Sequence, residues 1–95
     1  MAIIESEKKI EIKLSSEVKR LGGMTLKLLS THFTGLPDRI CLFPGGRLAF
    51  IELKTTKKKP TKIQIHVHKT LIRLGFDVRV IDTSEGINKL INDYE

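Results

Sequence analysis

Two carboxylates and a lysine near the middle of the chain are of types that could act together in catalysis. Glu52 and Lys54 are two residues apart in a strand-like segment, so their side chains project from the same face. Asp38 begins the preceding strand-like segment, directly after Pro37. Paired carboxylates suit a hard divalent cation such as Mg²⁺ or Mn²⁺, and a neighbouring lysine can orient or activate a nucleophile. Such a set can carry out the hydrolysis of a phosphodiester bond.

The turn between the two segments decides whether Asp38 and Glu52 meet. A two-residue turn would place Asp38 opposite Leu53 and on the wrong face, whereas a turn of three or five residues with a glycine bulge places it opposite Glu52. The connecting sequence is Pro44-Gly45-Gly46, and two consecutive glycines permit the bulged turn. We therefore predict the register in which Asp38 and Glu52 are neighbours. An ordinary ion pair on a solvated sheet face is the alternative, and the apolar residues on both sides of Glu52 count against it.

Seven elements are predicted to position these residues. Helical periodicity, capping signals and glycine stops predict helices at 5–21, at 61–74 and from 83 or 84 onward. Apolar runs bounded by turn residues predict strands at 24–29, 38–43, 47–54 and 76–82. The order is αβββαβα. Since a strand, a helix and another strand form a crossover, the last two strands should be parallel, after an antiparallel meander. We expect an α/β fold, with a mixed four-stranded sheet flanked by helices, as a single domain over residues 1–95.

The charge balance favours a polyanionic partner. The chain has 17 Lys and Arg against 11 Asp and Glu, a formal net charge of +6, which attracts phosphates. Part of this excess follows the candidate catalytic strand, where it could grip a nucleic-acid backbone. The residues concerned are Lys57, Lys58, Lys59 and Lys62. A flexible lysine loop that serves only solubility is the alternative.

Other features exclude several classes of function. Aromatic residues make up only 5% of the chain, so binding by base stacking is not expected. The single Cys41 excludes an internal disulfide, and no Cys/His spacing fits structural zinc. His32, His66 and His68 are expected to be surface or helix-face residues and not ligands. No apolar run is long enough to span a bilayer, so we expect a soluble, cytoplasmic protein. No motif for an organic cofactor is present, so we expect none to bind.

Several motifs in order resemble one nuclease family. The motifs are Gly35-Leu-Pro-Asp-Arg39, Pro44-Gly-Gly46, Phe50-Ile-Glu-Leu-Lys54 and Gln64 at the start of the following helix. Together they resemble the VRR-NUC (virus-type replication-repair nuclease) branch of the PD-(D/E)XK superfamily, from about residue 7 to residue 87. The resemblance implies a restriction-endonuclease-like core and a metal-dependent DNA endonuclease.

The resemblance also implies roles for individual residues. Asp38 and Glu52 would bind Mg²⁺ or Mn²⁺, the backbone carbonyl of Leu53 would complete the protein ligands, and Lys54 would be the catalytic lysine. Gln64 would support the active site or contact the substrate backbone. The family also uses a glutamate from the first helix. Glu11 matches that motif best, and Glu7 is a rival because it lies deeper in the apolar stripe of the helix.

The expected partners follow from this interpretation. The leading hypothesis is a DNA endonuclease of the small, stand-alone phage type, acting as a homodimer on branched or junction DNA in the cytoplasm of a bacterial host, in DNA repair. The alternative hypothesis is a non-catalytic nucleic-acid-binding module that uses only the lysines. A small-molecule enzyme is a third, weaker hypothesis.

Overall fold

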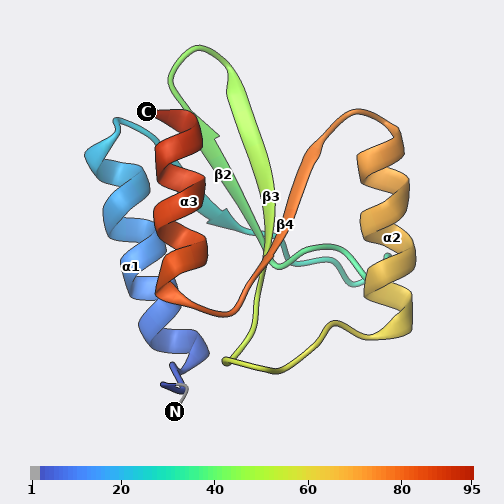
Figure 1. Cartoon of the computed structure of the whole chain (residues 1–95). Helices are drawn as coiled ribbons and strands as arrows, with labels where there is room; N and C mark the ends of the chain where they lie inside the picture. The colour runs from blue at the N-terminus through green and yellow to red at the C-terminus, as the bar shows by residue number, and fades with distance from the viewer. Residues whose placement is uncertain (1–2) are drawn as a thin grey trace.

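Three helices flank a four-stranded sheet in the computed structural model, which describes residues 3–95 (Figure 1). The helices are α1 (Glu7–Arg20), α2 (Lys62–Arg73) and α3 (Ser84–Tyr94). The strands are β1 (Met24–Lys27), β2 (Arg39–Phe43), β3 (Arg47–Leu53) and β4 (Asp77–Ile81). The predicted element order and the α/β class are confirmed. The predicted strands included Asp38 and Lys54, whereas in the structure Asp38 directly precedes β2 and Lys54 directly follows β3.

The sheet has the order β1-β2-β3-β4 and is mixed, as predicted. The first three strands form an antiparallel meander, and β4 pairs parallel to β3 through the crossover that contains α2. Figure 1 shows α1 and α3 together on one side of the sheet and α2 on the other. The two faces of β3 therefore have different surroundings: one meets the pair of helices, and the other, which includes Glu52, meets α2.

The core lies between the sheet and the pair formed by α1 and α3. Ile10, Leu14 and Val18 form the apolar stripe of α1 and are 0% exposed. They pack in one cluster with the inward residues of β2, β3 and α3, and each such buried aliphatic side chain contributes roughly 1.5–3 kcal/mol. Within residues 3–95, none of the helices has both the length and the apolar character needed to cross a membrane.

The β2–β3 hairpin sets the register of the candidate site. β2 ends at Phe43 and β3 begins at Arg47, so the connection has three residues, of which Gly45 and Gly46 have φ angles of 84° and 74°. Only glycine adopts two such consecutive conformations without strain. In the resulting register Arg39 pairs with Ile51, which puts Asp38 opposite Glu52. The predicted bulged register is confirmed.

The loop before β2 is held against α2 by close contact at a glycine. Gly35 has a φ angle of 98°, and a β-carbon added there would lie 2.7 Å from Cγ2 of Ile63 and 2.9 Å from its carbonyl oxygen. Pro37, two residues later, is among the fully buried side chains. In Figure 1 this loop reaches across to α2. The loop therefore delivers Asp38 to the same end of the sheet at which α2 begins.

Candidate active site

Glu52 is the central group of the candidate site. It is only 2% exposed, although a carboxylate is costly to bury without partners. Its Oε2 atom accepts a hydrogen bond from Nε2 of Gln64 at 3.1 Å and lies 3.3 Å from Nζ of Lys54. The buried setting excludes the solvated sheet face considered as an alternative, while the Glu52–Lys54 ion pair itself is present.

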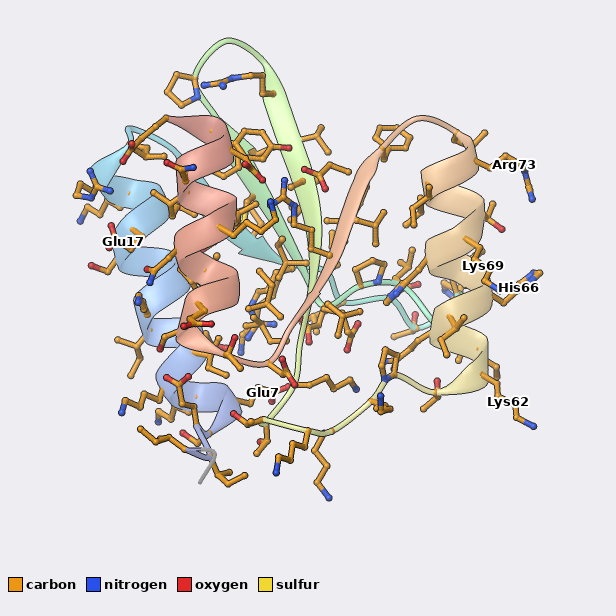
Figure 2. All side chains as sticks on the ribbon, in the orientation of Figure 1. Glu7, Glu17, Lys62, His66, Lys69 and Arg73 are labelled. Carbon is orange, nitrogen blue, oxygen red and sulfur yellow. The ribbon has the colours of Figure 1, made fainter. Side chains whose placement is uncertain are left out.

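The second oxygen of Glu52 has no hydrogen-bond partner. Oε1 is buried, and Nε2 of His68 lies 3.8 Å from it, which is too long for a hydrogen bond. His68 Nε2 is likewise buried and unpaired. Of the two expected positions, a surface or a helix-face residue, His68 takes the second, since it is 6% exposed on the face of α2 turned to Glu52. His66 takes the first, and Figure 2 shows it pointing away from the sheet. Burial lowers the pKa of His68, and the charge of Glu52 opposes this shift.

Asp38 is held at the edge of the site by the backbone of β3. Its two carboxylate oxygens lie 3.2 and 3.3 Å from the Leu53 nitrogen, whose N–H donates to them. Burial, followed by the negative charge of Glu52, raises the pKa of Asp38 to about 7, and the bond from Leu53 only partly offsets this. Burial and the facing charge of Glu52 therefore disfavour the charged form of Asp38.

The two glutamates of α1 have different partners. Glu11 forms a close ion pair with Nη2 of Arg39, and Nη1 of the same guanidinium lies 3.5 Å from Asp38. Glu7 is exposed, and its backbone N–H donates to the hydroxyl of Thr55, just after the candidate catalytic lysine. Figure 2 shows Glu7 where α1 begins. Its charge contributes to the raised pKa of Asp38. Glu7 is thus a free carboxylate near Asp38, whereas Glu11 is neutralised by Arg39.

Gln64 has two tasks in this structure. As the sequence predicted, Thr61 and Gln64 form a capping box at the start of α2, in which the Gln64 Oε1 atom accepts from the Thr61 N–H. The Nε2 atom of the same amide donates to Glu52. The helix cap therefore fixes the orientation of the amide that contacts the carboxylate.

The segment after β3 that carries Lys57, Lys58 and Lys59 is anchored to Asp82 where it begins. Thr56 is buried and its hydroxyl donates to the Asp82 carbonyl, while the Lys57 N–H donates to the Asp82 carboxylate at 3.0 Å. A pocket of about 360 Å³ lies here, lined by Lys57, Lys58, Lys59, Pro60, Ile65, Val80 and Asp82. Val80 is the register partner of Glu52, so the pocket adjoins the candidate site. Lys62 points away from the sheet in Figure 2 and does not line this pocket.

The donor set fits a hard cation held with few protein ligands. Across residues 3–95 no three His, Cys, Asp or Glu side chains gather as a ready-made metal cluster. The site instead offers two carboxylates, one with a buried oxygen that lacks any partner and one with a pKa raised by burial and by its neighbour. Mg²⁺ commonly uses one or two protein carboxylates and keeps several waters, so this set suits it.

Sequence reasoning missed two residues of the site, His68 and Arg39. The signal for His68 was available, because it follows Gln64 by four residues and so shares its helix face. Arg39 gave no such signal, since only the packing of α1 on the sheet brings Glu11 to it. The remaining predicted residues, Asp38, Glu52, Leu53, Lys54 and Gln64, are brought together at one end of β3.

Comparisons with known proteins identify the family and fold of the chain. No family model matches the chain. It is 39% identical over 79 residues to the protein named "Putative nuclease p44" of Acyrthosiphon pisum secondary endosymbiont phage 1, covering 83% of this chain and 85% of the phage protein. A solved structure described as "VRR_NUC domain" superposes with a TM-score of 0.86 at 26% identity, covering 96% of this chain and 100% of the other. The chain therefore belongs to the VRR-NUC family and has the fold of a nuclease.

Proposed function

We propose that this nuclease is a metal-dependent endodeoxyribonuclease that uses Mg²⁺ or Mn²⁺. The observation that carries the proposal is the buried, unpaired Oε1 atom of Glu52 beside Asp38. A buried carboxylate whose role is purely structural has both oxygens satisfied, because an unpaired one costs stability. The vacant oxygen and the crowded negative charge together favour a cation at this position.

The residues would divide the work as follows. Asp38, Glu52 and the backbone carbonyl of Leu53 would hold the metal. When bound, a divalent cation polarises a phosphodiester and lowers the pKa of a bound water. In the hydrolysis a water oxygen bonds to phosphorus, one P–O ester bond breaks, and the departing oxygen takes up a proton. Lys54, held 3.3 Å from Glu52, is placed to orient the attacking water or to offset negative charge on the phosphoryl group.

The remaining polar groups support this centre. Gln64 holds one oxygen of Glu52 through a fixed amide. Of the two α1 glutamates, Glu7 has the free carboxylate, and Glu11 would have to leave Arg39 before it could act as a ligand.

The pocket beside the site supports a nucleic-acid substrate. Lys57, Lys58 and Lys59 line it together with Val80, the register partner of Glu52, and the backbone of the segment is anchored to Asp82. Each lysine that contacts a phosphate releases counterions and so adds to affinity. The lysines would thus hold the DNA backbone on one side of the bond that is cut.

The homodimer, the preference for branched or junction DNA, a role in DNA repair and a cytoplasmic location stay predictions. Exposed apolar side chains on β1 and its following loop provide apolar surface that a second copy could cover: Met24, Leu26, Leu29 and Phe33. Sedimentation of the purified protein in solution would measure whether it is dimeric.

A cleavage assay tests the proposal. The protein, with Mn²⁺ or Mg²⁺, is incubated with single-stranded, duplex, flap and four-way-junction DNA, including closed circles that only an endonuclease can open. We expect metal-dependent cleavage that is lost in Asp38→Asn, Glu52→Gln and Lys54→Ala. If no substrate is cut with either metal, or if Glu52→Gln cuts as well as the wild type, the nucleic-acid-binding module becomes the better interpretation. Binding of Mn²⁺ measured by isothermal titration separates the two independently, because a pure binder has no use for the metal.

A further inference from the structure

His68 is a buried group at the site that has no role in the proposed reaction. Its side chain is 7% exposed, and its Nε2 atom faces Oε1 of Glu52 at 3.8 Å. Both atoms are buried and neither has another hydrogen-bond partner. Two unpaired polar atoms that face each other in the interior point to an interaction that is completed in another state of the site.

We propose that His68 is a positioning residue that orients the Glu52 carboxylate by donating a hydrogen bond from Nε2–H to Oε1. The inference rests on the proposed function, because it concerns the carboxylate that would bind the metal. A carboxylate oxygen has two lone pairs, so Oε1 can accept from His68 and still act as a ligand. Ligating carboxylates are commonly held by such outer hydrogen bonds.

The geometry of α2 favours this role. Gln64 and His68 are four residues apart and therefore lie one turn apart on the same face of the helix. Gln64 already donates to Oε2 at 3.1 Å, and His68 faces the other oxygen. Held at one oxygen only, the carboxylate can turn about its terminal bond, whereas two donors from one rigid helix fix its plane. Closing the gap requires a movement of less than about 1 Å, since an N–H···O bond is about 2.9 Å long.

A structural role alone does not account for His68. A histidine kept only to fill space would be as well replaced by an apolar residue, because an unpaired polar atom in the interior is unfavourable. His66 provides the internal comparison. It lies on the same helix two residues earlier, is exposed and points away from the sheet (Figure 2).

The test compares three variants of the full chain. His68→Leu removes the donor while roughly keeping the volume, His68→Gln restores an N–H donor near the position of Nε2, and His66→Leu is the matched control. Binding of Mn²⁺ is measured by isothermal titration, and thermal melting of the metal-free proteins reports on folding. We expect His68→Leu to bind Mn²⁺ about tenfold more weakly, the low end of the range for outer-ligand changes, and to melt no lower than the wild type. His68→Gln and His66→Leu should bind like the wild type.

Two results would overturn the inference. The first is that His68→Leu binds Mn²⁺ as tightly as the wild type. The second is that His68→Gln melts normally but binds Mn²⁺ as weakly as His68→Leu, because the restored donor would then have no effect on metal binding. Should His68→Leu fail to fold, His68→Met, which likewise lacks an N–H donor, takes its place in the comparison with His68→Gln. A wild type that binds no Mn²⁺ would instead contradict the proposed function, so the two failures can be told apart.

Discussion

Replacing Asp38 by asparagine should stabilise the metal-free protein at alkaline pH while removing its nuclease activity. Burial and the charge of Glu52 raise the pKa of Asp38 from an ordinary 3.8 to about 7. The charged form of this group is therefore unfavourable in the folded protein. The stability that protonated Asp38 contributes is fully present below about pH 4 and is lost as the pH rises through about 7. Asparagine avoids this loss, and its side-chain oxygen can still accept the N–H of Leu53.

The size of the stability difference follows from the pKa shift of Asp38. A difference of about 3 pKa units corresponds to about 4 kcal/mol at most, of which about 2–3 kcal/mol falls between about pH 5 and about pH 8. The Asp38 side chain is 30% exposed, so solvent screening reduces this to about 1 kcal/mol. For a domain of this size, that is a melting-temperature difference of about 5 °C.

Thermal melting in the presence of a chelator measures this prediction. The wild type and Asp38→Asn are melted at about pH 5 and about pH 8, and the difference between the two proteins is compared at the two pH values. Comparing the two proteins at each pH removes the pH effects that they share. The melting temperature of Asp38→Asn should increase relative to that of the wild type as the pH rises. Adding Mn²⁺ at the higher pH should raise the melting temperature of the wild type more than that of the variant. Parallel pH dependence in the two metal-free proteins would refute the reasoning.

Three further predictions follow from individual contacts. Gly35→Ala should destabilise the fold by about 1–3 kcal/mol more than Gly75→Ala in chemical denaturation, because both glycines have a φ angle of 98° but only the first meets Ile63; equal losses would mean that backbone strain alone matters. Replacing lysines 57–59 by alanine should weaken DNA binding and reduce the slope of log affinity against log salt by about 2–3, and an unchanged slope would show that these lysines do not contact phosphates. Glu7→Gln should lower the pKa of Asp38 measured by NMR titration, because the charge of Glu7 contributes to its rise; an unchanged pKa would show that Glu7 does not act on Asp38.

Local signals made the framework of this protein predictable. The capping box of Thr61 and Gln64 and the spacing of Ile10, Leu14 and Val18 depend on residues within one or two turns of helix, so they can be read without knowing the fold. The register of the β2–β3 hairpin is also local. Its two glycines select a three-residue turn, and the turn then places Asp38 opposite Glu52.

Packing between distant segments decided the rest. His68 becomes buried because α2 packs with the face of Gln64 and His68 against β3; the four-residue spacing places the two on one helix face, and only packing decides that this face meets the sheet. Likewise, Arg39 neutralises Glu11 only because α1 lies across the end of β2.

The sequence by itself thus determined the elements, their order and the strand register that joins Asp38, Glu52 and Lys54, since each depends on short-range geometry. The tertiary structure alone decided how each carboxylate is paired: one oxygen of Glu52 bonded and the other vacant, Glu11 neutralised, and Asp38 with a raised pKa. The physical reason is that burial and charge compensation depend on every neighbour in space. Some of those neighbours come from segments far apart in the sequence, as in the pair of Glu11 and Arg39, which are 28 residues apart.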